Sequence, residues 1–232
     1  DNSADHVLIE DATDGELKKA LIPAATSATD SFTISGSTPT LTIGDAGAED
    51  TKIVFDGNAQ DYHIGLDDST DSLVIGKGSA LGTTSHIVTD ENGHVTKPLQ
   101  TAFYANVSSN YNPGTDGNHT VTYASEVYDV NADYNNSTYT FTAPVTGKYL
   151  ISTAVRGYDV DATWSLAHSI VTSNRTYHNN TTRGQQDQYI STIVVVADMD
   201  ASDTAFVRIN ANESAFQISG DTYSYFTAAL IC

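Results

Sequence analysis

The stretch Phe141-Thr-Ala-Pro144-Val-Thr-Gly147-Lys-Tyr149 is the most informative part of the 232-residue chain. Pro144 has no backbone N–H to donate to a strand ladder, so it predicts a strand end or a turn. Gly147 tolerates a positive φ, and Tyr149 follows it at the start of an apolar alternation. The stretch therefore predicts two strands joined by a tight turn. The alternative is a generic β-turn, which would show the same pattern without indicating a particular fold.

Strand patterns surround this turn throughout the C-terminal half of the chain. From Tyr149 to Arg156 the odd-numbered residues are markedly more apolar than the even-numbered ones, as in a strand with one buried face. Candidate strands lie at residues 102–107, 120–123, 139–142, 148–156, 163–172, 189–197, 205–211 and 223–231. Eight such strands, with turn signals roughly every 8 to 15 residues, predict an all-β sandwich or jelly roll.

These features together resemble the complement C1q-type globular head, a trimeric jelly roll of the tumour-necrosis-factor superfamily. The nine residues quoted above are similar to the family pattern F-x-A-P-x-x-G-x-Y. Ala102-Phe103-Tyr104-Ala105 is similar to the opening strand, and Tyr225-Phe226-Thr-Ala-Ala-Leu230-Ile231 to the closing one. The resemblance covers residues 103–231 and departs from the family at Ala228, where Gly is usual, and at Ser202-Asp203, where Gly-Asp is common. It implies a C1q/TNF-like jelly-roll sandwich that assembles as a homotrimer.

Short apolar runs, each three or four residues long and most of them closed by Gly or Asp-Gly, repeat through residues 32–98. They are residues 32–36, 41–44, 53–57, 62–65, 73–76 and 86–88. Each run is too short to bury its apolar residues within one chain. We therefore expect an elongated β-repeat stalk in which three chains pack together, with a small two-sheet domain as the alternative.

The first 31 residues predict a strand pair. Val7, Leu8 and Ile9 oppose residues 17–22 across Asp14-Gly15, which is a strong hairpin signal. A helix over residues 16–22, ended by Pro23, is the competing interpretation, because several of these residues are good helix formers. The apolar residues Val7, Leu8, Ile9 and Leu21 are candidates for attachment to another protein. The predicted organisation is an attachment segment at 1–31, a trimeric stalk at 32–98 and a jelly-roll head at 99–232.

The charge balance limits the partners of the chain. Ten Lys and Arg residues against 29 Asp and Glu residues give a net charge of −19, which opposes binding to nucleic acid and to anionic membrane surfaces. No apolar run reaches the roughly 18 residues that span a bilayer, so membrane insertion is not expected. The single cysteine, Cys232, excludes an intrachain disulfide framework and a zinc site built on several thiolates.

Strand parity places three connections at the end of the head farthest from the stalk, around residues 157–162, 179–188 and 212–222. Aromatic and amide side chains there suit sugar recognition, by stacking on ring faces and hydrogen bonding to hydroxyls. The candidate ligand-binding residues in and beside these loops are Tyr158, Tyr177, His178, Asn179, Asn180, Arg183 and Gln185. Exposed polar loops without a ligand are the alternative.

Calcium is the one metal for which the sequence suggests a site, because clustered carboxylates are its preferred ligands and heads of the resembled family sometimes bind it. The candidate ligands are Asp159, Asp161, Asp198 and Asp200. The alternative is that they are ordinary residues of solvated turns, as expected in a chain with 29 acidic residues. No other cofactor is expected. There is no Gly-x-Ser-x-Gly nucleophile motif, and the acidic clusters are more typical of turns than of glycosidase pairs, so we expect no enzymatic activity.

The order of stalk and head, in a chain rich in Ser, Thr, Asn and Asp, is similar to that of structural proteins of tailed bacteriophages, particularly marine ones. This resemblance implies a non-enzymatic tail fibre or spike component of the virion. The N-terminal segment would bind other virion proteins, and the head would contact a glycan or protein receptor on the host. The alternatives are a capsid or tail decoration protein without a host ligand, a secreted or cell-surface bacterial adhesin, and a polysaccharide depolymerase.

Overall fold

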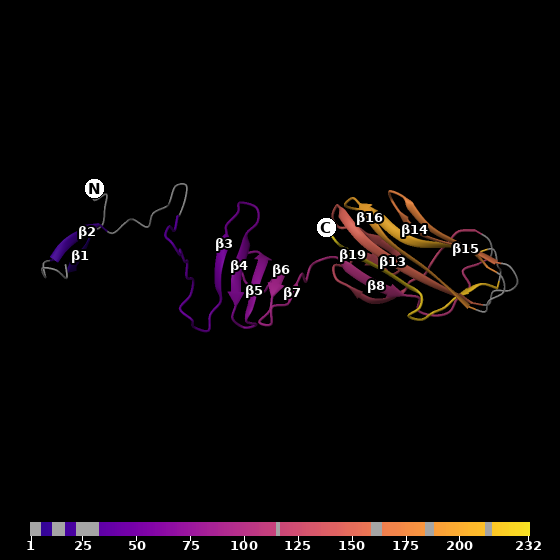
Figure 1. The fold of residues 1–232 in the computed structure, drawn as a ribbon, viewed down its shortest axis with the longest axis horizontal. Helices are drawn as coiled ribbons and strands as arrows, with labels where there is room; N and C mark the ends of the chain where they lie inside the picture. The colour runs from indigo at the N-terminus through magenta and orange to yellow at the C-terminus, as the bar shows by residue number, and fades with distance from the viewer. Residues whose placement is uncertain are drawn as a thin grey trace. The chain divides into compact units, whose positions relative to one another are not determined.

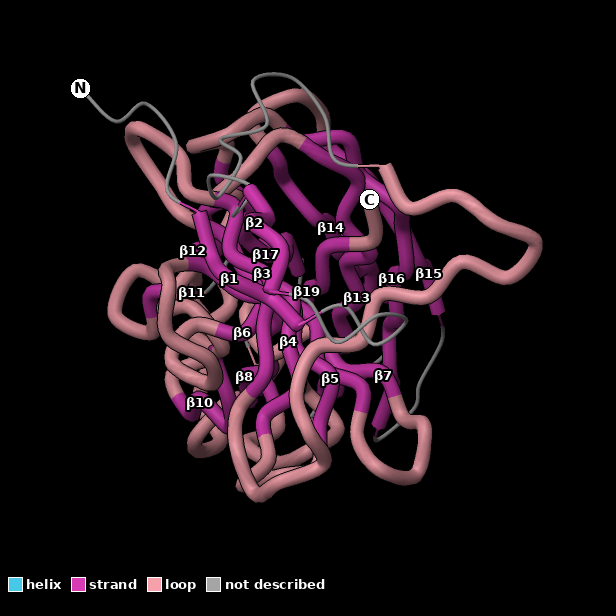
Figure 2. The backbone as a smooth tube through the Cα atoms, turned by 90° about the vertical axis from the view of Figure 1, so that its left-hand side faces the viewer, coloured by secondary structure: helices cyan, strands magenta, loops and turns pink. Residues whose placement is uncertain are grey.

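The computed structural model describes residues 6–10, 17–21, 33–114, 117–158, 164–183, 188–211 and 215–232. The chain divides into two units, residues 1–47 and 48–232. Within the described residues the regular elements are β-strands (Figure 1, Figure 2), which confirms the predicted all-β class. In this part of the chain no helix is present that could cross a bilayer.

The described residues of the first unit include one strand pair. β1 (His6–Glu10) and β2 (Leu17–Leu21) are antiparallel neighbours, so residues 17–21 form a strand rather than the competing helix. The side chains of Val7, Leu8, Ile9 and Leu21 lie outside the described residues, and their attachment role stays a prediction.

Two of the predicted repeat units form no strand. Residues 33–36 and 41–44 are bends and irregular backbone, while Phe32 lies outside the described residues. The side chains of Ile34, Leu41 and Ile43 are exposed. A strand needs a neighbouring ladder to satisfy its backbone groups, and Pro39 between the two runs cannot donate to one. The prediction of strands at these two units was therefore wrong.

The other four units become strands of one antiparallel sheet. Its order is β3 (Thr51–Phe55), β4 (Tyr62–Asp67), β5 (Ser72–Lys77), β6 (Ser85–Thr89) and β7 (Val95–Thr96). The register places Ile53, Ile64, Ile75 and Ile87 side by side across four strands. An antiparallel sheet thus precedes the C-terminal domain, and a single sheet replaces the two-sheet alternative.

Residues 102–230 form a sandwich of two antiparallel sheets. The first has the order β10 (Ser125–Asp129), β8 (Ala102–Asn106), β19 (Tyr225–Leu230), β13 (Gly147–Tyr158) and β16 (Gln188–Met199), with β18 (Gln217–Ile218) also paired to β13. The second has the order β11 (Tyr134–Asn135), β12 (Thr140–Thr142), β17 (Thr204–Ala211), β14 (Trp164–Thr172) and β15 (Thr176–Arg183), with β9 (His119–Thr120) also paired to β17. The first and last strands, β8 and β19, are antiparallel neighbours, as the jelly-roll prediction requires.

An aromatic cluster fills the interior of this sandwich. Phe103 stacks on Tyr134 with ring centroids 4.5 Å apart, and its ring lies 5.2 Å from Phe141 and 5.0 Å from Phe226. All four side chains are buried. The opening strand, the quoted nine-residue stretch and the closing strand therefore meet in one core, which explains why these three segments carried the resemblance.

Gly147 has a different role from the one predicted. Its φ lies outside the left-handed region. A Cβ at this position would lie 2.7 Å from Cys232 O and 2.8 Å from Leu230 Cδ1. The neighbouring Lys148 N–H donates to Cys232 O at 2.6 Å. Glycine is needed here because the end of the chain passes directly over β13, and a side chain would block that approach.

The sequence patterns did not predict β15. The expected connection at 179–188 is strand as far as Arg183, and β16 begins at Gln188, with residues 184–187 outside the described part. β15 is polar and ends its sheet, so it shows no apolar alternation. Edge strands of this kind resemble loops when only hydrophobic periodicity is considered.

Candidate assembly and binding surfaces

The outer face of the first sheet exposes a strip of aliphatic side chains. Leu150 on β13 and Ile190, Val194 and Val196 on β16 form this apolar strip, and each is between 43 and 59% exposed. Leu150 and Val196 are direct partners in the register, so the strip crosses from one strand to the other. Alternate residues of the same strands, such as Ile151, point into the core. Strands with an apolar outer face as well as an apolar inner face are typical of sheets that are covered on both sides.

Three stacked tyrosines occupy the other part of the same face. The Tyr104 ring lies 5.5 Å from Tyr225 and 6.2 Å from Tyr128, on three neighbouring strands. Ser152 Oγ is 3.3 Å from the Tyr225 hydroxyl. Burial, reinforced by the two neighbouring tyrosines, raises the pKa of Tyr104. Tyr104 is therefore neutral at physiological pH. The stack presents a flat aromatic surface, made of a residue type that is enriched in protein interfaces.

The charged residues on the outer face of β13 lie near its two ends and are close to opposite charges. Arg156 Nη1 donates to Asp221 Oδ2 at 3.0 Å, and the guanidinium lies 4.5 Å from the centre of the Tyr223 ring. At the other end Lys148 is the register partner of Asp198. The middle of the face is left apolar and aromatic, which is the usual anatomy of an interface with a polar rim.

The candidate ligand-binding residues of β15 alternate between solvent and interior. His178 and Asn180 are exposed, whereas Tyr177 packs against the core. Asn179 Nδ2 donates to Ser191 Oγ and to Thr192 O, each at 3.2 Å, and so joins the two sheets. Of the four, His178 and Asn180 are the ones that a ligand outside the sandwich can reach.

The remaining candidates are more scattered. The Tyr158 hydroxyl donates to Gln217 Oε1 at 2.9 Å. The backbone of Arg183 pairs with Trp164, but its side chain lies outside the described residues, as does Gln185. The structure therefore places five of the candidates, Tyr177, His178, Asn179, Asn180 and Arg183, on β15. A common site with Tyr158 and Gln185 stays a prediction.

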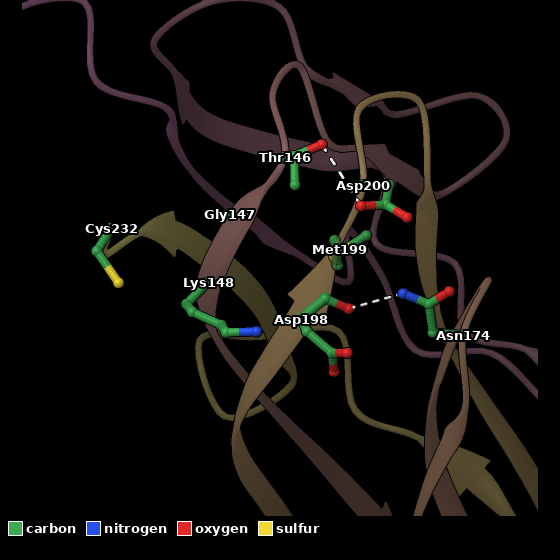
Figure 3. Close-up of a pocket in the computed structure, with 8 residues that line it drawn as sticks. All are labelled: Thr146, Gly147, Lys148, Asn174, Asp198, Met199, Asp200 and Cys232. Atoms are coloured by element: carbon green, nitrogen blue, oxygen red, sulfur yellow. Dashed lines mark hydrogen bonds between the residues drawn. The ribbon is translucent and has the colours of Figure 1, made fainter.

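The calcium candidates Asp198 and Asp200 line a pocket of about 430 Å³ between the start of β13 and the end of β16 (Figure 3). Asp198 already forms an ion pair with Arg175, with 2.7 Å between Oδ2 and Nη2. Asp200 Oδ1 accepts a long hydrogen bond of 3.5 Å from the Thr146 hydroxyl. Asp159 and Asp161 lie outside the described residues. Among the residues that are described, no three His, Cys, Asp or Glu side chains are grouped as metal ligands.

The apolar strip was not predicted as a surface, although the sequence contains a signal for it. Ile193, Val194, Val195 and Val196 are consecutive apolar residues, so both faces of β16 must be apolar. A run of this kind predicts a strand that is buried on both sides. The second sheet covers one side of β16, and the other side is exposed.

Two antiparallel sheets with adjacent first and last strands define a jelly-roll sandwich. The family model of the C1q domain matches residues 102–231, and the chain therefore belongs to the C1q domain family. Domains of the C1q and TNF type typically form trimers and are generally non-enzymatic.

Several solved structures match the chain at low sequence identity. The globular domain of zebrafish complement 1qA protein is 15% identical, with a TM-score of 0.42 over 57% of this chain and 98% of that chain. Murine APRIL at pH 5.0 is 14% identical, with a TM-score of 0.44 over 57% of this chain and 99% of that chain. Eiger TNF from S. frugiperda is 13% identical, with a TM-score of 0.41 over 58% of this chain and 92% of that chain. No curated protein matches the sequence.

Proposed function

We propose that this chain is a non-enzymatic virion protein, a trimeric tail fibre or spike component whose C1q head holds three copies together and contacts the host cell surface. The observation that carries the proposal is the apolar strip, an uncharged surface on a chain with a net charge of −19. Copies of so acidic a chain repel one another unless a neutral, apolar surface brings them together.

The arrangement of the face suits a closed ring of copies. The apolar strip lies on β13 and β16 at one edge of the sheet, and the tyrosine stack reaches β10 at the other edge. A closed ring of three copies needs two different patches, because each copy uses one patch toward each neighbour. The strip of one copy would pack on the tyrosine stack of the next. Burying each half-exposed aliphatic side chain contributes on the order of 1 kcal/mol.

Host contact is assigned to the exposed polar residues of β15. His178 and Asn180 are exposed, and His178 Nδ1 lies 2.9 Å from Ser169 Oγ. The imidazole Nε2 and the Asn180 amide are therefore the groups offered to the hydroxyls of a glycan. Three copies of a weak site on one trimer would give the avidity that attachment to a cell surface requires. The strand pair of residues 6–21 would bind other proteins of the virion.

The test of assembly is Val194→Lys, compared with wild type by sedimentation velocity. The lysine places a charge in the middle of the strip, and we expect the trimer to be replaced by a monomer. Val145→Lys is the matched control, since Val145 is 47% exposed and lies in a turn outside the strip. A Val194→Lys protein that keeps the wild-type mass would contradict the assembly surface.

Host contact is tested with the labelled full chain on a glycan panel and on whole bacteria. Asn180→Ala should lower binding by about tenfold or more without changing the melting temperature, because it removes donors and acceptors used by a ligand. Binding that is unchanged in Asn180→Ala and in His178→Ala would contradict this site. A trimer that binds neither glycans nor cells would favour the decoration role instead.

A further inference from the structure

The β3–β7 sheet has one face that its own chain covers over β4 and β5. His63 and Val74 are buried on this face. His63 Nδ1 lies 2.8 Å from Gly78 O, and a Cβ placed on Gly76 would lie 2.6 Å from His63 Nε2 and 2.7 Å from Thr84 O. The segment 78–84 therefore closes this side of the sheet tightly enough to require glycine beneath it.

The opposite face of the same sheet is apolar and uncovered by any described residue. We call it the open face. It consists of Ile53, Phe55, Tyr62, Ile64, Leu66 and Leu73, which are between 37 and 55% exposed. Ile53 pairs with Ile64, Phe55 with Tyr62, and Leu66 with Leu73, so the six side chains form one continuous surface.

The open face is a contiguous apolar surface that approaches the size of an interface. With about 200 Å² for a residue of this size, the six exposed portions sum to roughly 500 Å² per copy. Val95, which is 63% exposed on β7, extends the surface. Monomeric proteins rarely expose more than a few hundred Å² of contiguous apolar surface. A standard interface buries about 800 Å² on each partner, so the open face approaches what a stable association needs.

The charges around the sheet favour a second copy of this chain as the occupant. On β3, β4 and β5 the positions that share the open face carry one charge, Lys77, which is the register partner of Tyr62 at a strand end. Two open faces can thus approach without repulsion between carboxylates, although the chain as a whole is strongly acidic.

The connection to the head also favours this occupant. β7 ends at Thr96 and β8 begins at Ala102, so residues 97–101 span at most about 18 Å. The end of this connection is attached to the head, because Leu230 N–H donates to Thr101 O at 3.1 Å. Once heads associate, their sheets are tethered at an effective concentration in the millimolar range.

We propose that the open face is a second self-association surface, which packs against the open faces of the other copies that the head brings together. This inference rests on the proposed function for the presence of those copies. The contact itself lies outside the C1q domain and involves different residues, so the two can fail separately.

The test uses two neighbouring residues of β3 in the full chain, with Cys232 changed to Ser. Ile53 lies on the open face and is 42% exposed, while Val54 lies on the other face and is 38% exposed. In an isolated chain, Ile53→Cys and Val54→Cys should react with a maleimide at similar rates. If open faces pack together, Ile53→Cys should react on the order of tenfold more slowly than Val54→Cys, because labelling then requires the sheets to separate.

Light scattering on the same samples separates the two proposals. A trimer in which both cysteines react equally fast overturns the inference and leaves the proposed assembly standing. A monomer in which both react equally fast overturns both. The same pair is also measured with Val194→Lys present, where the protection of Ile53→Cys should increase with chain concentration. Protection that is independent of concentration would mean that the same chain covers the face, which also overturns the inference.

Discussion

His168 Nδ1 lies 3.0 Å from Ser191 Oγ, and this hydrogen bond joins β14 of one sheet to β16 of the other inside the sandwich. Both side chains are buried. Ser191 Oγ also accepts from Asn179 Nδ2 at 3.2 Å, so one hydroxyl links three strands. Burial lowers the pKa of His168 to about 3, and the folded protein therefore holds this imidazole neutral.

The first prediction concerns the pH dependence of stability. The unfolded chain protonates His168 near pH 6.5, whereas the folded chain does so only near pH 3. The stability that the neutral imidazole contributes is complete above pH 6.5 and is lost as the pH falls toward 3, at up to about 1.4 kcal/mol per pH unit. Urea unfolding at pH 7, 6, 5 and 4 should show a shallower decline in His168→Gln than in wild type. Equal slopes would contradict the prediction.

The second prediction concerns the hydroxyl that links the sheets. Ser191→Ala removes the partner of His168 and one partner of Asn179 inside the core. Asn179 keeps its hydrogen bond to Thr192 O, whereas the buried His168 Nδ1 loses its partner, which should lower the free energy of unfolding by about 1–3 kcal/mol. Ser137→Ala, at an exposed turn where the backbone N–H makes the hydrogen bond, is the control and should change it by less than about 0.5 kcal/mol. A Ser191→Ala protein as stable as this control would refute the link.

A third prediction follows from the approach of the chain end to β13. Gly147→Ala places a methyl group 2.7 Å from Cys232 O, and the ends of two strands must shift to admit it. We expect a loss of about 1–3 kcal/mol, measured by thermal or urea unfolding. Gly36→Ala is the matched control, because a Cβ there meets no atom within 4 Å and the φ is unstrained. Equal stability of the two variants would show that the close approach does not determine the residue at 147.

A fourth prediction concerns Tyr123, which is fully buried. Its hydroxyl donates to Ala154 O at 3.0 Å and lies 2.9 Å from Thr153 Oγ1. Tyr123→Phe should destabilise the head by about 1–2 kcal/mol, since the buried carbonyl and hydroxyl then lose a partner. Tyr139→Phe, at a half-buried ring outside the apolar strip and the tyrosine stack, should be close to neutral. Equal unfolding free energies for the two variants would contradict the assigned hydrogen bonds.

Much of the fold could be predicted because its main determinants are local. Phe141, Pro144 and Tyr149 mark a strand, a turn and a further strand within nine residues, and alternation identifies β13 without any tertiary information. The polar edge strand β15 could not be predicted in this way, because its pairing with β14 is set by register rather than by apolar periodicity. The strand predictions within residues 33–44 were wrong for the opposite reason. Short apolar runs predict strands even where no neighbouring strand is present to pair with them.

The surfaces were harder to predict than the fold. The apolar outer faces of β16 and of the β3–β7 sheet depend on which side of each strand the rest of the chain covers. The sequence of a single strand does not show which of its sides is covered. The consecutive residues Val194, Val195 and Val196 indicate only that both faces of β16 are apolar. Asn179 was expected to face a ligand, and it joins the two sheets because alternation along β15 turns it inward.

The central claim is that copies of this chain assemble through the head. The most direct test is the mass of the full chain by light scattering across a dilution series near pH 7. We expect three times the 24.7 kDa chain mass, maintained on dilution into the micromolar range. A mass of 24.7 kDa at every concentration would contradict the account, because the apolar strip and the tyrosine stack would then remain exposed to water.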